Sequence, residues 1–224
     1  NLLYPNCKYT VEDIVKKYPK RQLPESAEVT RIAPSPTGFL HIGTAYIALI
    51  NKLMASNGGV FYFRLEDTDK KREVENSGDI AYDMLCKFNI KPQEGFTGEN
   101  KPEIGVYGPY RQSDRKEIYE VFAKYLVEKG NAFPCFCKKT ESITEIKERR
   151  EKELEENADL ESKDPCRTLT YDEIKAKIDA GEEFALRLKS CGNEENVFKF
   201  TDLAKGEREL RENDKDIVLI KSNG

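Results

Sequence analysis

The clearest hydrophobic pattern lies in residues 28–67 and predicts a strand, a helix and a second strand. EVTRIA is rich in β-branched residues and stops at PSPTG, whose prolines and glycine cannot continue a strand or a helix. HIGTAYIALINKLMASNGG follows with helical spacing and a glycine end, its apolar positions being Ile42, Ala45, Tyr46, Leu49 and Leu53. VFYFRLED is a nearly continuous apolar run, as in a strand buried on both faces of a parallel sheet. These elements predict a βαβ unit.

Further along the chain, the pattern predicts a helix over residues 74–88 and another from Ser113, its N-cap, to Gly130. The apolar stripe of the latter helix comprises Ile118, Phe122, Tyr125 and Leu126. Residues 138–164 are dominated by charge and predict a solvated helix. TYDE then forms a capping box before a short helix, and FALRLKS and DIVLIKSNG are interpreted as strands. An α/β front half therefore precedes a mixed α+β part.

Composition and charge narrow the function classes. The chain has 224 residues, of which 35% are charged, and a formal net charge of −4. This net acidity argues against a broadly basic surface for nucleic acid, although it leaves room for a local basic stripe. His41 is the only histidine, which excludes any site built from two or more histidines of this chain. No apolar run reaches the roughly 18 residues of a membrane span. Because no secretory signal is visible and the six cysteines are scattered, we expect reduced thiols and a cytoplasmic protein.

The segment from Arg31 to Thr44 carries the candidate chemistry, because it joins the first strand to the first helix. Ligands of open parallel sheets bind beyond the carboxyl ends of the strands, where a helix N-terminus favours phosphate. Gly38 and Gly43 allow the backbone to approach a nucleotide, and His41 can donate hydrogen bonds to phosphate oxygens. The segment matches neither the Walker A nor the GxGxxG pattern.

Four segments carry a family resemblance. PSPTGFLHIGTA resembles the HIGH-type motif of class I aminoacyl-tRNA synthetases, and RIAPSPTG paired with RLEDTD is similar to the glutamyl-tRNA synthetase subgroup. GPYRQSDR and DIVLIKSNG also resemble segments of that family. The resemblance covers residues 28–224 and implies a Rossmann-like parallel-sheet nucleotide-binding domain with an inserted α+β connective domain. We therefore expect an N-terminal extension (1–27), the first half of the catalytic domain (28–134) and the connective domain (135–224).

The resemblance also implies roles for individual residues. The substrate glutamate would contact Arg31, Ala33, Ser35 and Glu66, with Arg31 on its side-chain carboxylate and Glu66 on its α-ammonium. ATP would be bound by Pro36, Thr37, Gly38, His41 and Gly43. The catalytic group would comprise His41, Gly43 and Thr44.

The activity implied is glutamate–tRNA ligation in protein biosynthesis. The family activates L-glutamate with ATP and Mg²⁺ and transfers it to the 3′ end of tRNA(Glu), and we expect a monomer. Its lysine-rich KMSKS loop lies further downstream, and Lys221-Ser222 matches that motif poorly. We therefore expect residues 1–224 alone to be inactive, with the chain ending before the second half of the catalytic domain.

A metal site is also considered. Some bacterial glutamyl-tRNA synthetases have zinc on Cys-x-Cys and Cys-x-His at this place, resembling Cys135, Cys137 and Cys166 here. Thr168 replaces the histidine, so Asp164 or Tyr171 would have to complete the four ligands of a structural zinc. We therefore expect thiols without zinc and no other metal ligand in the chain.

Several alternatives remain at this point. Close ones are glutaminyl-tRNA synthetase and glutamyl-queuosine-tRNA synthetase, the short enzyme that glutamylates a modified tRNA base. A nucleotidyltransferase of the same superfamily would need no amino-acid pocket, so Arg31 and Glu66 would point away from the His41 cleft. A non-catalytic ATP- or RNA-binding module is the alternative from another class.

Overall fold

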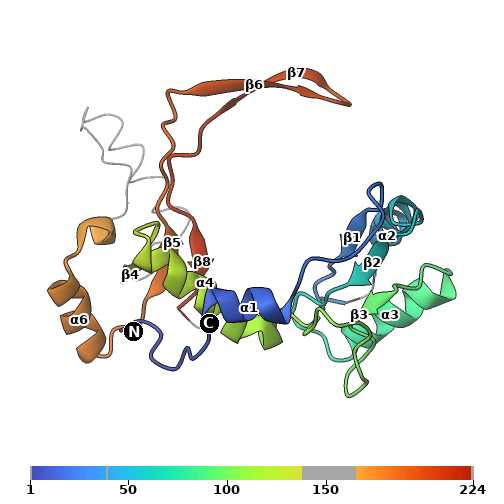
Figure 1. Ribbon diagram of the computed structural model, residues 1–224, viewed down its shortest axis with the longest axis horizontal. Coiled ribbons are helices and arrows are strands. Elements are labelled where there is room, and N and C mark those ends of the chain that lie inside the picture. The colour runs from blue at the N-terminus through green and yellow to red at the C-terminus, as the bar shows by residue number, and fades with distance from the viewer. Residues whose placement is uncertain (1, 39, 138–164, 223–224) are drawn as a thin grey trace. The chain divides into compact units, whose positions relative to one another are not determined.

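The computed structural model describes residues 2–38, 40–137 and 165–222. The chain forms two compact units (Figure 1). One comprises Lys8–Tyr119, and the other combines Asn1–Cys7 with Glu120–Gly224. The predicted functional boundaries at residues 28 and 135 stay predictions.

The first unit is built on a parallel sheet with the strand order β1-β2-β3. The strands are β1 (Val29–Ile32), β2 (Val60–Phe63) and β3 (Glu94–Gly95), and each pairs in parallel with its neighbour. Helices α2 (Ile42–Met54) and α3 (Ser77–Lys87) connect them. The predicted α/β fold is therefore confirmed, although α3 begins three residues later than the first residue of the predicted helix.

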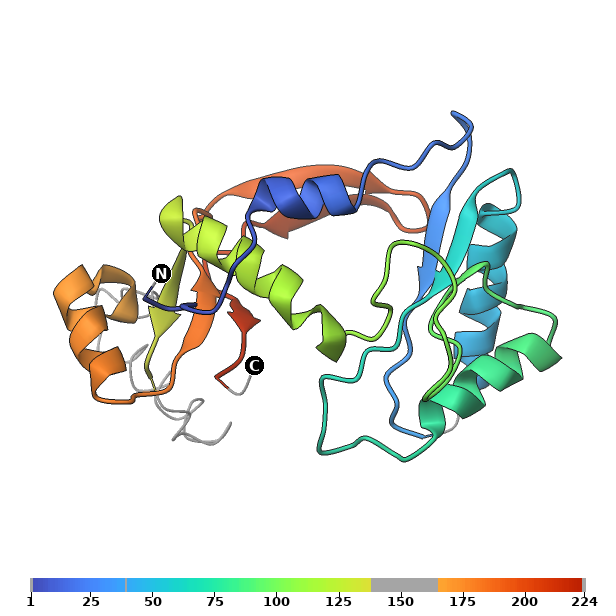
Figure 2. The same cartoon turned by 60° about the horizontal axis from the view of Figure 1, so that its bottom comes forward.

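The core of this unit lies between one face of the sheet and the two helices (Figure 2). Ile32 of β1 and Phe61 and Phe63 of β2 are buried there. They pack in one cluster with Ala48 of α2 and Leu85 of α3. Alternate positions along each strand thus point into the core, as the two-residue period of a strand requires.

The opposite face of the sheet is more exposed, so the prediction that the second strand is buried on both faces is wrong. Buried and half-buried positions alternate along β2, with Tyr62 half-buried between two buried phenylalanines. Arg31 occupies the matching exposed position of β1, because it pairs with Tyr62 in the parallel register. The apolar run is misleading because Val60 and Tyr62 are only half-buried, although Tyr62 packs against the edge of the core cluster.

Helix α2 contacts the rest of its unit through small side chains. Ala45 and Ala48 are buried, whereas Ile42, Tyr46 and Leu53 are 71%, 64% and 58% exposed. Alanines let a helix backbone approach the sheet more closely than large side chains would. The predicted apolar stripe is therefore at helical spacing, but its large members do not form the core.

The helix predicted from Ser113 begins later. Residues Ser113–Arg115 form a 3-10 turn, and α4 runs from Lys116 to Glu128. Its buried residues are Val121 and Ala123, while Phe122 and Tyr125 of the predicted stripe are substantially exposed. Ser113 does not cap the helix, because its hydroxyl is bound to a carboxylate elsewhere.

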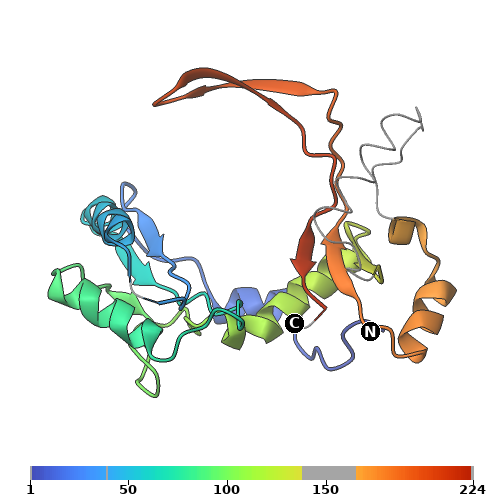
Figure 3. The same cartoon turned by 180° about the vertical axis from the view of Figure 1, so that it is seen from behind.

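The second unit contains an antiparallel sheet with the order β4-β5-β8. Its strands are β4 (Ala132–Cys135), β5 (Ala185–Leu188) and β8 (Val218–Ile220). The 3-10 turn η2 (Pro165–Thr168) packs against β4, and the capping box of Thr170 and Glu173 precedes α6 (Tyr171–Asp179), as predicted. Strands β6 (Val197–Asp202) and β7 (Gly206–Arg211) pair as a separate antiparallel ribbon (Figure 3). The charged segment 138–164 lies outside the described residues.

The residues before β1 include one helix, α1 (Val11–Lys17). A capping box between Thr10 and Asp13 begins it, and its residue Ile14 is buried. Across the described ranges, no helix combines the length and the apolar character that a membrane crossing requires.

Candidate functional site

The two motif segments of the first unit lie side by side beyond the carboxyl ends of β1 and β2. The Glu66 N–H donates to the Pro34 carbonyl at 3.0 Å, and the Val74 N–H donates to the Pro36 carbonyl at 2.8 Å. The first bond joins the RLED segment to the PSPTG loop, and the second joins the chain that follows this segment to the same loop. The structure thus brings together the two sequence motifs that predicted the site.

Three charged side chains form a cluster on the more exposed face of the sheet. Arg31 Nη1 lies 3.2 Å from Glu66 Oε1, and Arg64 Nη2 donates to the same oxygen at 2.8 Å. Arg31 pairs with Tyr62 in the register, so Arg64 and Glu66 follow two and four residues further along on the same face. The predicted residues Arg31 and Glu66 are therefore in contact, and Arg64 joins them without having been predicted.

The remaining predicted glutamate-binding residues, Ala33 and Ser35, follow Arg31 at two-residue intervals. Ala33 is half-buried and Ser35 is exposed. The Thr37 N–H donates to the Ser35 carbonyl at 2.8 Å, which closes a tight turn, and Pro36 is buried beneath it. Gly38 has a φ of 131°, a conformation that side-chain-bearing residues rarely adopt. The loop shape therefore depends on glycine at this position.

His41 is exposed and forms the N-cap of α2. Its Nδ1 accepts a hydrogen bond from the Gly43 N–H at 3.0 Å, and its carbonyl accepts from the Thr44 N–H at 2.9 Å. Because Nδ1 is the acceptor, the neutral ring carries its proton on Nε2. This Nε2–H is a donor located at the positive end of a 13-residue helix, a suitable place for a phosphate.

Gly43 is packed against the imidazole ring. A Cβ atom at this position would lie 3.1 Å from His41 Nδ1, closer than most real contacts. Glycine therefore lets the ring cap the helix.

A fully buried carboxylate fixes the chain directly after Glu66. Asp67 accepts hydrogen bonds from the Ser113 N–H at 2.9 Å, from Ser113 Oγ at 2.6 Å and from Lys70 Nζ at 3.2 Å. Burial alone would raise the pKa of Asp67, but the bonds from Ser113 and Lys70 outweigh it and keep this pKa below the usual value. The GPYRQSDR segment thus supports the candidate site through Ser113, which sequence analysis assigned to a helix cap.

Residues before β1 are tied to the same sheet. Both Nη atoms of Arg21 donate to the carboxylate of Glu94 at 2.6 Å, and the guanidinium lies 3.8 Å above the ring of Tyr107. Tyr110 Oη donates to Glu94 at 2.6 Å. The hydrogen bonds from Arg21 and then from Tyr110 lower the pKa of Glu94 despite its partial burial. The segment expected as an N-terminal extension therefore has a structural role next to β3.

An open polar cleft of about 570 Å³ adjoins the PSPTG loop at Pro36. Its charged lining residues are Lys70, Glu73, Glu75, Glu99 and Arg111. Three carboxylates against two cations do not favour a phosphate there. The N-terminus of α2, rather than this cleft, therefore stays the predicted position of a nucleotide.

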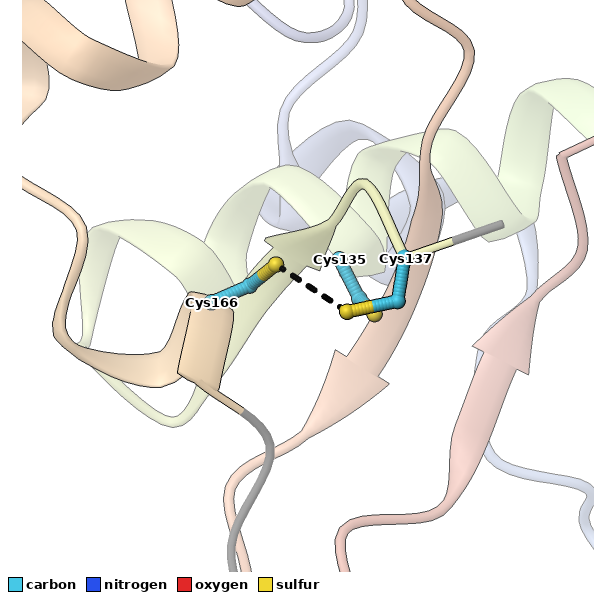
Figure 4. Close-up of side chains that lie close together, drawn as sticks. All are labelled: Cys135, Cys137 and Cys166. Atoms are coloured by element: carbon cyan, nitrogen blue, oxygen red, sulfur yellow. Dashed lines mark hydrogen bonds between the residues drawn. The ribbon is translucent and has the colours of Figure 1, made fainter. Parts of the chain in front are cut away.

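The second unit holds a cluster of three thiols (Figure 4). The sulfur atoms of Cys135, Cys137 and Cys166 all lie within 4.8 Å of one another, and those of Cys137 and Cys166 are 3.6 Å apart. Thiolates around a tetrahedral zinc are separated by about 3.8 Å, so the three sulfurs fit part of such a site. In the described part of the chain the group contains only these three candidate ligands, and Asp164 lies outside it. The expectation that zinc is absent stays a prediction.

Comparison with known proteins agrees with the motifs. Residues 28–224 match the family described as tRNA synthetases class I (E and Q), catalytic domain. The glutamate–tRNA ligase of Clostridium beijerinckii is 45% identical over 225 residues, covering all of this chain and 40% of that protein. That of Clostridium perfringens strain 13 is 44% identical over 228 residues, covering all of this chain and 41% of that protein.

A solved structure shares the fold. The glutamate tRNA ligase of Elizabethkingia meningosepticum, crystallised in complex with its amino acid, superposes with a TM-score of 0.68 at 28% identity. The match covers 89% of this chain and 39% of that one. The chain thus spans about two fifths of the length of these relatives. Because the family match extends over most of the sequence and agrees with the observed sheet, this chain belongs to the class I tRNA synthetases for glutamate (E) and glutamine (Q), as part of their catalytic domain.

Proposed function

We propose that the natural protein is a glutamate–tRNA ligase. It would activate L-glutamate with ATP and transfer the glutamyl group to the 3′ end of tRNA(Glu), as a monomer in the cytoplasm. The observation that carries this proposal is the contact between Arg31 and Glu66 beside the PSPTG loop. The names of the similar ligases support it.

Glutamate has the charges that this cluster complements. Its α-ammonium pairs with Glu66, and its side-chain carboxylate pairs with the planar guanidinium of Arg31. Ala33 and Ser35 continue the same extended segment and line the pocket, Ser35 through its hydroxyl. A nucleotidyltransferase without an amino-acid substrate would have no use for this pair of opposite charges.

ATP binds at the N-terminus of α2. His41 donates Nε2–H to a phosphate oxygen as negative charge develops, and the helix dipole adds to this stabilisation. Pro36, Thr37 and Gly38 shape the loop that the nucleotide approaches, while Gly43 and Thr44 hold the capped first turn. Mg²⁺ accompanies ATP as part of the substrate.

The chemistry then needs positioning more than a protein nucleophile. An oxygen of the α-carboxylate attacks the α-phosphorus of ATP, and the bond from this phosphorus to the bridging oxygen of the β-phosphate breaks. Pyrophosphate leaves with the electron pair, and glutamyl-adenylate remains. A terminal ribose hydroxyl of tRNA then attacks the glutamyl carbonyl carbon, and the bond from this carbon to the phosphate oxygen breaks. AMP leaves with the electron pair and takes up the hydroxyl proton. Alignment and charge stabilisation supply the rate enhancement.

The test is isotope exchange between pyrophosphate and ATP, catalysed by the natural full-length protein with tRNA(Glu) present. We expect exchange that depends on L-glutamate and is at least tenfold slower with L-glutamine. Faster exchange with L-glutamine would instead identify a glutaminyl enzyme. Absence of exchange with both amino acids, alongside retained ATP binding, would identify a non-catalytic module.

A further inference from the structure

We propose that Arg64 is a second arginine for the side-chain carboxylate of the amino-acid substrate and that it sets the preference for glutamate over glutamine. This inference rests on the proposed function and deepens it. Arg64 directly precedes Leu65-Glu66 at the end of β2 and was given no role by the motif resemblance.

The contacts place Arg64 in the candidate pocket. Its Nη2 donates to Glu66 Oε1 at 2.8 Å, and Arg31 Nη1 lies 3.2 Å from that same oxygen. Two guanidinium groups from neighbouring strands therefore converge on one carboxylate oxygen. The side chain of Arg64 is only 21% exposed, compared with 39% for Arg31. Arg64 is thus the deeper of the two cations.

Arg64 also has unused donor capacity. Its Nε is buried and has no hydrogen-bond acceptor among the residues that the structure describes. A buried guanidinium N–H without an acceptor is costly, so such a donor is expected to find a partner. A carboxylate oxygen of the substrate would supply that partner once the Arg64 side chain turns away from Glu66, whose charge the substrate ammonium then takes over.

The charges of the cluster match one substrate better than the other. Arg31, Arg64 and Glu66 carry two positive charges and one negative charge. L-Glutamate carries two negative charges and one positive charge, so its side-chain carboxylate can pair with the two arginines and its ammonium with Glu66, while its α-carboxylate faces ATP. L-Glutamine lacks the side-chain charge, so it would bring no counter-charge to the two half-buried guanidinium groups, and specificity depends on losses of this kind.

The side-chain carboxylate is the better partner for Arg64. Arg31 and Arg64 both precede the level of Glu66 along the strands, so a substrate whose ammonium contacts Glu66 can direct its side chain back toward them. The α-carboxylate has to attack ATP, and a tight pair with arginine would reduce its nucleophilicity. Both arginines therefore bind the side-chain carboxylate, which does not react, rather than the α-carboxylate.

The experiment measures dissociation constants of L-glutamate and L-glutamine by calorimetry or ligand-observed NMR, using the natural full-length protein. In Arg64→Gln we expect the dissociation constant for L-glutamate to rise by about 10- to 100-fold. That for L-glutamine should change by less than about threefold, because its uncharged amide oxygen is a much weaker acceptor for a guanidinium than a carboxylate is. Arg64→Lys retains the charge and should keep most of the discrimination.

Arg72→Gln is the matched control, because Arg72 is exposed and paired with Asp69. It should leave both dissociation constants unchanged, and unfolding temperatures would show that each variant is folded. Equal weakening of both ligands in Arg64→Gln would overturn the proposal, because Arg64 would then only position Glu66. No change with either ligand would also overturn it. Failure of the wild type to bind L-glutamate would refute the proposed function itself and, with it, this role of Arg64.

Discussion

Arg31 and Glu66, which we assign to opposite ends of the bound amino acid, contact each other at 3.2 Å. The two side chains therefore compensate each other's charge in this structure. A substrate must separate the two side chains and replace their contact with one ion pair at each end. This exchange keeps both charges compensated before and after binding, so neither is left buried without a partner.

Glu66→Gln tests the ammonium end of the pocket. The substitution retains the size of the side chain but removes the charge that pairs with the α-ammonium. We expect the KM for L-glutamate in pyrophosphate exchange to rise by about 10-fold or more, with the KM for ATP changed much less. Glu25→Gln, at an exposed position, is the matched control. An unchanged KM for L-glutamate would show that Glu66 does not contact the substrate.

His41→Asn separates the two roles of His41. Asparagine is a good N-cap, so the helix should keep its stability. It lacks a donor at the place of Nε2–H, and the loss of one such donor lowers kcat by roughly 10²–10³-fold in other enzymes. We expect a fall of that order with an unchanged unfolding temperature. A normal kcat would mean that His41 only caps the helix.

Gly43→Ala should reduce activity and change stability by less than about 1 kcal/mol, because the lost cap offsets the gain in helix propensity. Gly43 has an ordinary helical backbone, and alanine is favoured over glycine in helices by up to about 1 kcal/mol. The added Cβ would press on His41 Nδ1 and displace the ring, and a displacement of this kind lowers rates by up to about 10²-fold. Thermal unfolding and kcat measured on the same variant test this. Full activity would indicate that the ring position does not matter.

Ser113→Ala tests the support of Asp67. The hydroxyl stabilises the ionised carboxylate, so we expect a loss of about 1–3 kcal/mol in the free energy of unfolding at pH 7. Because the folded pKa of Asp67 is lowered, its contribution is present above the unfolded pKa and is lost as pH falls through the folded pKa. The difference between the variant and the wild type should therefore shrink below about pH 4. Ser56→Ala is the exposed control, and a difference independent of pH would contradict the assignment.

The cysteine cluster gives a prediction about metal. We expect purified protein to contain well under one zinc per chain, because only three of the four usual ligands have been identified. Elemental analysis together with thiol titration measures this. Stoichiometric zinc that persists after dialysis against a chelator would show that a fourth ligand completes the site.

The pattern of apolar and polar residues predicts the order of the first elements of the sheet but not which of their faces are buried. Strands β1 and β2 and the helix between them follow from EVTRIA, PSPTG and the glycines that end the helix. The burial of β2 could not be predicted, because Tyr62 and Val60 are as apolar as the core residues beside them. Which face of a strand is covered depends on helices whose placement is a tertiary property.

The candidate site likewise contains residues that the sequence identified and residues that only the structure revealed. Arg31, His41 and Glu66 were identifiable because they belong to spaced motifs that resemble a known family. Arg64 was visible two residues before Glu66, on the same face of a strand, but its contact with Glu66 Oε1 depends on the side-chain conformation. Ser113 matched a helix-cap pattern, yet a buried carboxylate 46 residues earlier binds its hydroxyl. Such long-range partners leave no local signal.

The most direct test of the account is a crystal structure of the natural full-length protein with L-glutamate bound. The ammonium should contact Glu66, the side-chain carboxylate should contact Arg31, and these two residues should no longer lie 3.2 Å apart. Glutamate bound elsewhere, with the contact between Arg31 and Glu66 intact, would contradict the account.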